Sequence, residues 1–483
     1  MSRAVDTATR LVTTNDALTA CVEGIECIML EAKIQNYAGK LHRAWTTMRR
    51  ASAMAELIGL HRKAKWSTLK FLDAESKVDF DPEHFCFRMV EMDRYLCITL
   101  GLPRSSLKTC ALTPEAMAAC QPVDRIARLH LVVTERILTP DIETHITSCT
   151  MTRETESLLQ TAASEMPSQW WLTPDFDCRY DTVANSFCEV ARILHQFSHY
   201  HLLIRLHLPY MLSTSSENDY GYSTLAAANA ARETLSRYIA FRKWNPGHFY
   251  CRGLDFVAFI ALTALCLAHI GSSHQMMRTS DIGQSGGNGG MVLAQSHSSD
   301  RGLMERALEM LKSTGDDFIA SNLSRTMQHL LDVETQAAEG TAYNTITSPC
   351  EEGIGCGGDP DDELDALRLN IPYFGTIYVG RMMVLRPAGD LAVTERFRAP
   401  NPTFSDPLYG QGTDQSHQIG DEEIPQPMLP SHDAWDPLAD ITSLPDAFSA
   451  TNDFDEIDDW TFQNINEALF SSIFNSSSNQ NAT

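Results

Sequence analysis

The sequence predicts an all-α fold followed by a disordered acidic tail, and three observations lead to this prediction. Apolar residues recur at three- and four-residue steps through most of the first 270 residues, which is the period of an amphipathic helix. Glycine or proline follows several of these stretches, as expected where helices end. From Ala399 onward the chain carries 15 acidic residues and no lysine or arginine.

The first two predicted helices are marked by their apolar faces and by their ends. Residues 41–55 place small and apolar side chains on one face, and Gly59 then supplies a stop, because glycine adopts the left-handed conformation without a steric penalty. Residues 85–100 form the second helix, which stops at Gly101 with Pro103 just beyond it. Both glycines are interpreted as backbone stops and not as binding residues.

The later apolar stretches predict the centre of the fold. Helical periodicity covers 185–209, and an alanine-rich helix covers 225–241. The most apolar run, 256–270, is fifteen residues long, which suits a buried helix and is short for a membrane span. Helical pattern returns at 302–333, and a short extended stretch follows at 371–379. Strand–helix alternation is not evident, so the class is all-α.

Composition divides the chain into four parts. Residues 1–271 hold the main helical domain, and residues 272–300, which contain GQSGGNGG, are predicted to form a Ser/Gly-rich linker or surface loop. Residues 301–398 are the C-terminal part of the helical region. Residues 399–483 are rich in Pro, Asp, Ser, Gln and Thr with few aliphatic residues, so burial cannot offset their ordering entropy and they are predicted to be disordered.

Charge and cysteine usage exclude several classes of protein. The 483 residues include 62 acidic and 38 basic ones, a formal net charge of −24, so the chain is a poor candidate for binding nucleic acid unaided. The 13 cysteines are scattered through apolar stretches, which indicates reduced thiols in an intracellular protein.

Residues 1–10 hold two arginines and no apolar core, so they do not resemble a signal peptide. No membrane partner is expected.

The candidates for metal binding and catalysis are weak. One helix carries a group of four histidines: His195, His199, His201 and His207. The i, i+4 spacing of the first two can hold a metal ion, but no third ligand is evident, so they are interpreted as partly buried, hydrogen-bonded histidines. The glycine run at 283–290 lacks a following Lys-Ser/Thr, and no serine is assigned as a nucleophile because no triad pattern accompanies one. We therefore predict no catalytic residue, no metal ligand and no DNA-binding residue, and no enzyme.

The tail contains a segment, DFDEIDDWTFQNINEALFSSIF at 453–474, in which acidic residues surround apolar ones. Acidic residues keep the aromatic side chains solvated, and the apolar ridge can fold as a helix into a partner's groove. This composition is typical of an activation segment that recruits a coactivator or the transcription machinery. In the alternative interpretation the segment packs back onto the same chain. The apolar residues of the segment are Phe454, Ile457, Trp460, Phe462, Ile465, Leu469, Phe470 and Ile473.

Several motifs resemble the fungal-specific transcription factor domain, the middle homology region found behind binuclear zinc-cluster DNA-binding domains. AWTTMRRASAMAELIGLHR at 44–62 is similar to that family's helix ending in a "LGLHR" turn, and RMVEMDRYLCITLGLPRS at 88–105 is similar to its "LDRYLSLLLGRP" helix. YHLLIRLHLPYM, CRGLDFVAFIALTAL and IPYFGTIYV further along the chain resemble later segments. The resemblance covers roughly residues 15–380, and the order and spacing of the motifs carry it.

The resemblance identifies eight family-signature residues, and we interpret them as structural. Neighbouring helical side chains point about 100° apart, so Asp93 and Arg94 are not expected to pair; Arg94 is expected to reach Glu91 instead. Half-buried charges must be paired to be tolerated, so this pair is expected to fix helix packing rather than to contact a ligand. The signature residues are Trp45, Gly59, His61, Arg62, Asp93, Arg94, Gly101 and Pro103.

Departures from the family pattern shape the functional prediction. The six-cysteine zinc cluster, basic linker and coiled coil of the family are not found in this sequence. The domain also looks clipped before Thr13, so we expect a truncated chain, or a regulator that does not contact DNA itself. Zinc is expected only if an upstream cluster is missing, and DNA contact only through that missing domain or a partner. The family implies a nuclear location, for which Arg49–Arg50 and His61–Lys65 are the candidate import signals.

The resemblance implies a nuclear transcription regulator, an activator of a metabolic gene cluster such as a secondary-metabolite cluster. The helical domain would restrain or tune the acidic tail, in response to a bound metabolite, and the tail would recruit coactivators. The alternative is a DNA-binding-deficient partner that dimerises with a complete zinc-cluster regulator. A homodimer of this chain is a further option. A Cys-x2-Cys-x6-Cys cluster encoded upstream of Met1 would distinguish truncation from the partner role.

Overall fold

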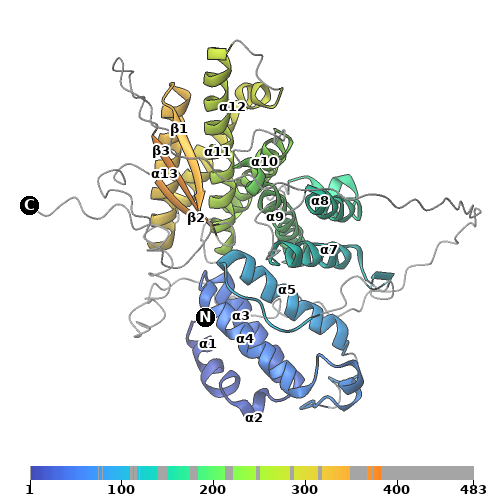
Figure 1. Cartoon of the computed structure of the whole chain (residues 1–483). Helices are drawn as coiled ribbons and strands as arrows, with labels where there is room; N and C mark the ends of the chain where they lie inside the picture. The colour runs from blue at the N-terminus through green and yellow to red at the C-terminus, as the bar shows by residue number, and fades with distance from the viewer. Residues whose placement is uncertain are drawn as a thin grey trace, which may run out of the picture. The chain divides into compact units, whose positions relative to one another are not determined.

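A computed structural model describes residues 2–381 with gaps, at 74–75, 79, 109–112, 114–116, 119, 140–148, 174–182, 213–220, 246–250, 283–287, 314–317, 349–366 and 372–374. The described chain is helical apart from one small sheet, so the predicted all-α class is confirmed (Figure 1). The predicted acidic tail at 399–483, with its activation segment, lies outside the described residues.

The N-terminal helices pack around α4. Helix α4 lies between α3 and α5, and the short elements α1, η1 and α2 precede them. Their bounds are α1 Ser2–Ala8, the π-helical turn η1 Thr9–Thr13, α2 Asp16–Thr19, α3 Val22–Tyr37, α4 Leu41–Ile58, the 3₁₀ turn η2 Lys63–Thr68 and α5 Pro82–Leu100. Figure 1 shows these elements together in blue.

The ends of α4 and α5 follow from their capping residues. Gly59 ends α4 with a φ of +81°, and Gly101 ends α5 with a φ of +72°, a conformation that glycine adopts most readily. At the start of α5, the Asp81 carboxylate accepts hydrogen bonds from the amides of Glu83 and His84, at 2.9 and 3.2 Å. Pro82 in the first turn suits a helix start. The predicted helix ends at both glycines are therefore found.

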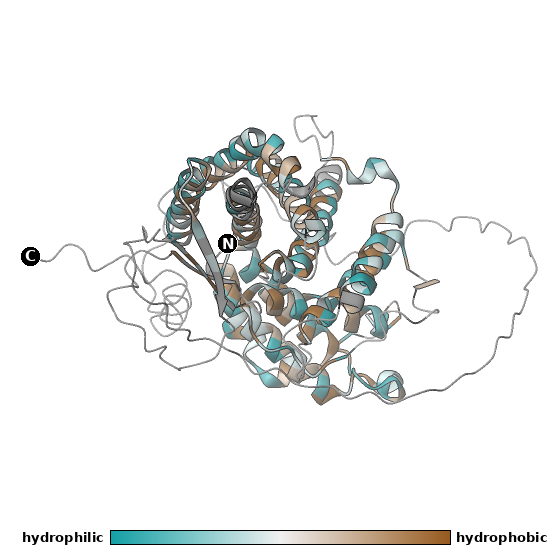
Figure 2. Ribbon diagram, turned by 45° about the horizontal axis from the view of Figure 1, so that its top comes forward, coloured by the Kyte–Doolittle hydropathy of each residue, from teal (hydrophilic) through white to brown (hydrophobic). Residues whose placement is uncertain are grey.

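Among the remaining helices, α9, α10, α12 and α13 pack around α11. Helix α7 packs against α5, α8 and α9, while α10 packs against α9, α11 and α12, and α13 covers another side of α11 (Figure 1). The bounds are α7 Pro122–Ile137, α8 Cys149–Ser164, the 3₁₀ turn η3 Ser168–Trp171, α9 Val183–Met211, α10 Gly221–Trp244, α11 Gly253–Ile282, α12 Asn288–Lys312 and α13 Phe318–Ala338. Figure 2 shows hydrophobic and hydrophilic residues alternating along many of these helices, as expected of amphipathic helices.

Helix α11 is the centre of the largest hydrophobic cluster. It contains the one stretch among the described residues, Gly253–His274, that is long and apolar enough to cross a membrane by length and composition. The most apolar 18 residues of this stretch are entirely buried inside the protein, as in the core helix of a bundle. The buried helix predicted at 256–270 is confirmed, and it is longer than the apolar run alone indicates.

The predicted linker at 272–300 is wrong for most of its length. Helix α11 continues to Ile282, and α12 begins at Asn288; only 283–287 lie outside the described residues. Serine and glycine are weak helix formers, but tertiary anchors override this preference: Leu293 is 2% exposed, and the Asp300 carboxylate pairs with Arg232 at 2.7 Å. Two widely spaced anchors are hard to recognise among so many polar residues.

The C-terminal described region differs in detail from the prediction. The single helical stretch predicted at 302–333 belongs to two helices, α12 and α13, with 314–317 outside the described residues. The described residues of the extended stretch predicted at 371–379 lie in a three-stranded antiparallel sheet of order β1-β3-β2, and 372–374 lie outside the described residues. The strands are β1 Tyr343–Ser348, β2 Leu367–Ile371 and β3 Gly375–Arg381. In the register, Tyr343 lies opposite Arg381, and Leu367 opposite Val379.

Candidate functional site

The most densely bonded polar cluster of the first helices is centred on Arg94 of α5. Its side chain is 1% exposed, and it binds four groups at once. Nη1 pairs with the Asp93 carboxylate and donates to Ser105 Oγ at 3.1 Å, and Nη2 donates to the Leu107 carbonyl at 2.7 Å. Nε pairs with Glu135 of α7. A guanidinium has five N–H donors in a fixed plane, so Arg94 can tie α5, α7 and the loop at 101–108 together.

The expectation that Asp93 and Arg94 do not pair is wrong. The two side chains leave the helix in different directions, but the long arginine stem curves back and brings its guanidinium onto the neighbouring carboxylate. The expected contact between Arg94 and Glu91 is also wrong, because Glu91 pairs with Arg88 at 3.0 Å. The partner of Arg94 on another helix is Glu135, and sequence spacing within α5 could not identify it.

Asp93 is fully buried and folds the following loop back onto α5. Its Oδ2 accepts hydrogen bonds from the backbone amide and the hydroxyl of Ser105, at 3.0 and 3.1 Å. On the other side, Arg49 Nη1 of α4 lies 3.7 Å from Oδ1. Leaving a buried carboxylate without partners is unfavourable by several kcal/mol, so these contacts fix the position of the loop at 101–108.

The structure brings five of the eight family-signature residues together around this loop. Trp45 of α4 donates its indole N–H to the Pro103 carbonyl at 3.3 Å, and Asp93, Arg94 and Gly101 lie on or at the end of α5. The Arg49 guanidinium lies 4.8 Å from the centre of the Trp45 ring, a cation–π contact that joins the same cluster.

The other three signature residues lie beyond the C-terminal end of α4. Gly59 ends that helix, and the exposed pair His61 and Arg62 follows it. Arg62 Nε donates to His61 Nε2 at 2.9 Å. Nearby, the Trp66 indole N–H donates to the Leu60 carbonyl at 2.8 Å, which holds η2 against the chain. These residues shape the turn after α4 and take no part in the Arg94 cluster.

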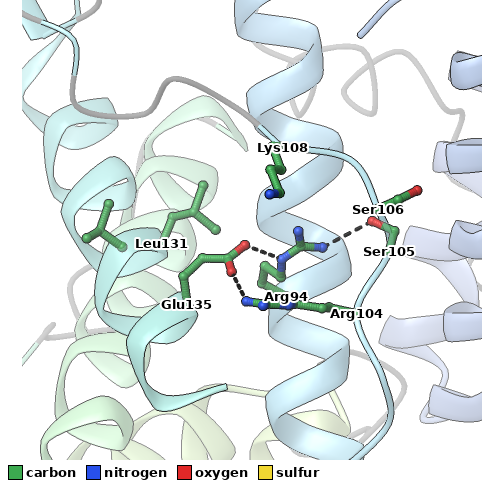
Figure 3. Close-up of a pocket in the computed structure, with 8 residues that line it drawn as sticks. Arg94, Arg104, Ser105, Ser106, Lys108, Leu131 and Glu135 are labelled. Atoms are coloured by element: carbon green, nitrogen blue, oxygen red, sulfur yellow. Dashed lines mark hydrogen bonds and ion pairs between the residues drawn. The ribbon is translucent and has the colours of Figure 1, made fainter. Parts of the chain in front are cut away.

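A pocket of about 540 Å³ opens beside the Arg94 cluster (Figure 3). Figure 3 shows Glu135 between the guanidinium groups of Arg94 and Arg104, with Lys108 pointing into the same space from above. Glu135 Oε1 pairs with Arg94, Oε2 pairs with Arg104, and Arg104 Nη1 donates to Thr139 Oγ1 at 2.9 Å. The lining residues are Arg94, Arg104, Ser105, Ser106, Lys108, Leu131, Val132 and Glu135.

Sequence reasoning missed the residues that give this pocket its charge. Arg104 lies near the end of the motif at 88–105 and Lys108 lies three residues beyond it, so two cations in a short loop after a helix stop are the signal that was available. Glu135 could not be found in this way because it comes from α7, 31 residues beyond Arg104 in the sequence. The pocket therefore depends on the packing of α5 against α7.

The predicted histidine group lies largely in the interior. His199 of α9 is 3.1 Å from His130 of α7, ring nitrogen to ring nitrogen, and both are buried. Burial lowers the pKa of His199 to about 4, helped by the nearby Arg237 guanidinium, and burial lowers the pKa of His201 to about 3. His207 lies 3.3 Å from Ser223 Oγ. These histidines are neutral at pH 7.

The metal interpretation gains no support from this arrangement. No group of three or more His, Cys, Asp or Glu side chains in the described parts of the chain could hold a metal ion. A metal site in a protein needs several converging ligands, whereas His199 and His130 face each other as a pair. The histidines contribute to the packing of α7 against α9.

Comparison with known proteins identifies relatives among fungal regulators, although no family model and no solved structure matches the chain. It is 30% identical to the Dehydrocurvularin biosynthesis regulator of Alternaria cinerariae over 539 aligned positions, which cover 99% of this chain and 68% of that protein. It is 34% identical to the Dehydrocurvularin biosynthesis regulator of Aspergillus terreus over 389 positions, covering 79% of this chain and 51% of that one.

A third relative agrees with these two. The chain is 32% identical to the probable transcription factor gsfR1 of Penicillium aethiopicum over 386 positions, covering 79% of this chain and 52% of that protein. The chain thus spans about half the length of two of these relatives and about two thirds of the first. With nearly the whole chain aligned to one regulator, the chain belongs to this family of fungal transcription regulators.

Proposed function

We propose that this chain activates transcription of a gene cluster for a secondary metabolite in a fungus. The observation that carries the proposal is the alignment of 99% of the chain with a regulator named for the biosynthesis of one such compound. Two further relatives are named as transcription factors. The densely packed helical fold and the acidic segment at 453–474 suit a regulatory domain joined to an activating tail.

In this proposal the two parts of the chain have different roles. The helical region resembles the middle homology region and restrains or tunes the tail, while the tail recruits a coactivator or the transcription machinery through apolar residues such as Trp460 and Phe470. Contact with DNA is made through an upstream zinc cluster or through a complete partner regulator, because the net charge of −24 opposes binding to a phosphate backbone.

Nuclear entry is part of the proposal, and the two basic groups differ in how accessible their charges are. Arg49 contacts Trp45 and Asp93, and Arg50 pairs with Glu31 at 3.5 Å. In contrast, residues 62–65 are exposed, and their three cations form no ion pair with any described residue. Basic clusters of this kind are recognised by nuclear import receptors, so we assign import to residues 62–65.

The import assignment is tested by replacing Arg62, Lys63 and Lys65 with alanine in the fluorescently tagged full chain. We expect the nuclear signal to fall at least severalfold. The charge-matched control replaces Lys243, Arg306 and Lys312, which are exposed on α10 and α12, and leaves the signal nuclear. A chain that stays nuclear without its 62–65 cations contradicts the assignment.

The regulatory role is tested by deleting the gene and measuring transcripts of the biosynthetic genes that adjoin it. We expect those transcripts to fall at least tenfold and to return when the gene is restored. Transcripts that rise on deletion indicate a repressor and contradict activation. Transcripts that depend equally on a second, complete zinc-cluster regulator favour the alternative of a DNA-binding-deficient partner.

The tail is tested by fusing residues 400–483 to an unrelated DNA-binding domain with a reporter gene. We expect activation, and we expect Trp460→Ala with Phe470→Ala to remove most of it. The matched control, Trp435→Ala with Phe448→Ala, changes two tail aromatic residues outside the acidic segment and is expected to keep the reporter active. A silent fusion, or one indifferent to both double variants, is incompatible with an activating segment at 453–474.

A further inference from the structure

The pocket beside Arg94 carries an excess of positive charge in an otherwise acidic protein. Arg94, Arg104 and Lys108 line it, and Glu135 is the one carboxylate among its lining residues. Asp93 lies behind Arg94 and pairs with it. The cluster of three cations and two carboxylates is left with one positive charge, whereas the whole chain has a net charge of −24.

The excess charge is available to a ligand. The Lys108 side chain is exposed, and its ammonium forms no hydrogen bond or ion pair with any described residue. Arg104 uses Nη1 for Glu135 and Thr139, while its Nε and Nη2 have no partner among the described residues. The Arg104 side chain is 39% exposed, so its free N–H groups can be reached from solvent. Two separate cationic groups therefore have donors to offer.

Glu135 shows what kind of anion this geometry accepts. Its two carboxylate oxygens are each held by a different arginine, one by Arg94 and the other by Arg104 (Figure 3). Arginine matches the planar shape of a carboxylate better than lysine does. The free Nε and Nη2 donors of Arg104 can hold a second carboxylate, with Lys108 neutralising its charge.

The remaining wall of the pocket is apolar. Leu131 and Val132 of α7 line it together with the positively charged loop. The pocket volume of about 540 Å³ lies within the range of small-molecule sites, which combine an apolar wall with a few polar anchors. Because one excess positive charge is available and Glu135 repels additional negative charge, a monoanion with a carbon body fits better than phosphate.

We propose that this pocket binds a small organic acid, with its carboxylate between Arg104 and Lys108 and its carbon body against Leu131 and Val132. The inference rests on the proposed regulatory function, for which the acid is the effector. Binding adds contacts to the loop at 101–108, which is tied to α4 through the Trp45–Pro103 hydrogen bond and to α5 through Asp93. Ligand binding is thereby coupled to α4 and α5, the two helices that carry the family signature.

The test uses the purified full chain and calorimetric titration with two acids, hexanoate and benzoate. Their neutral counterparts, hexanamide and benzamide, have nearly the same shape without the charge, and inorganic phosphate serves as an anion without a carbon body. We expect saturable binding of at least one acid with a dissociation constant below about 10 mM, and at least tenfold weaker binding of its amide and of phosphate.

Variants locate the site. Lys108→Ala and Arg104→Ala are each expected to weaken acid binding at least fivefold, whereas Arg306→Ala, an exposed arginine on α12, leaves it unchanged. Glu135→Gln is expected to tighten binding at least threefold, because it removes the carboxylate that competes for Arg104; a merely structural role for Glu135 does not produce this gain. Thermal melting of each variant checks that it is folded.

Three outcomes overturn the inference. These are the absence of saturable acid binding, an amide that binds as well as its acid, and acid binding that survives both cationic substitutions in folded protein. The transcript experiment is independent of these titrations. If deletion of the gene silences the cluster while no acid binds, the ligand inference fails and the regulatory function stands; the reverse result leaves a ligand-binding protein without the proposed regulatory role.

Discussion

The helices α4, α5 and α7 add buried ion pairs to their apolar contacts, whereas α9 to α13 pack around the apolar middle of α11. In the first region, Arg94 and Arg128 are each 1% exposed and pair with Glu135 and Glu83 of other helices. In the second, the middle of α11 consists almost wholly of apolar side chains with no exposed surface. Ion pairs with a buried carboxylate occur in this region as well, between Arg242 and Asp255 in the first turn of α11 and between Arg232 of α10 and Asp300 of α12.

This difference explains where a functional site can form. Apolar contacts are not directional and tolerate many arrangements, so the α11 region supplies stability without a defined polar surface. Buried charges need partners at fixed positions, so the α4–α5–α7 region fixes the loop at 101–108. The charged side chains of this loop, Arg104 and Lys108, then line the pocket. The buried charges of α4, α5 and α7 thus fix the position of the loop and the pocket, and the apolar packing around α11 contributes stability to the fold.

The largest effect is expected in the apolar region. Phe259→Ala removes a side chain that has no exposed surface and leaves a cavity in the core. We expect the free energy of unfolding to fall by about 3–5 kcal/mol, measured by urea titration with circular dichroism. The control, Leu172→Ala, changes a side chain that is 65% exposed and is expected to cost less than about 0.5 kcal/mol. Equal effects contradict the apolar-core interpretation.

The next effect breaks the ionic cluster. Asp93→Asn keeps the shape of the side chain but leaves Arg94 buried with its charge partly unpaired, so we expect the free energy of unfolding of the α4–α5–α7 region to fall by about 3 kcal/mol, seen as an early transition in the same titration. Glu305→Gln is the matched control, because it removes a carboxylate that is 56% exposed and pairs with Arg301 at the surface. Surface pairs contribute less than about 1 kcal/mol. A similar cost for both substitutions is the contrary result.

A pH effect is expected where α7 meets α9, at the boundary of the two regions. Burial, helped by the nearby Arg237 guanidinium, lowers the pKa of His199 from 6.5 for an unperturbed side chain to about 4 in the fold. The unfolded chain therefore takes up the proton first, so stability decreases as the pH falls below about 6.5. Between pH 7 and pH 5 this one group lowers the free energy of unfolding by about 2 kcal/mol.

The measurement compares wild type with His199→Gln across that pH window. The variant cannot take up a proton at this position, so we expect a shallower decline of stability towards pH 5. Other buried histidines with lowered pKa values, such as His130 and His201, contribute the remaining slope in both proteins. Parallel curves for the two proteins argue against a neutral, buried His199.

The smallest effect concerns the link between α4 and the loop. Trp45→Phe removes the hydrogen bond to the Pro103 carbonyl but keeps an aromatic ring beneath Arg49. We expect a loss of about 1 kcal/mol, measured by thermal or urea unfolding. A loss of unfolding free energy as large as that of Asp93→Asn would be the contrary result, because the position of the loop would then depend on Trp45 as much as on the buried carboxylate.

The fold class and several helices could be predicted from the sequence because those helices carry local signals. Gly59 and Gly101 mark helix ends through a local backbone requirement, and the apolar run in α11 marks a buried helix by composition alone. The predicted linker failed because the structure of α12 depends on anchors such as Leu293 and Asp300, whose partners lie on other helices. Long-range contacts of this kind are not encoded in local composition.

The candidate site was predictable only in part. The sequence points to Asp93, Arg94 and Pro103 as structurally important, but not to their contacts. Pairing of neighbouring residues depends on how a flexible arginine is held by Ser105, Leu107 and Glu135, which only the packed structure reveals. The side chains that charge the pocket come from a loop and a separate helix, so no single motif predicts them.

The central claim is that the buried carboxylate of Asp93 holds the loop at 101–108 in place, independently of the apolar core. Amide hydrogen exchange in wild type and Asp93→Asn tests it in both regions of one molecule. Ser105 N–H donates to Asp93 Oδ2 at 3.0 Å, so we expect exchange in this loop to accelerate about 30-fold, as for a local loss of about 2 kcal/mol, while α11 stays protected. Unchanged exchange in the loop, or equal acceleration in α11, would contradict the claim.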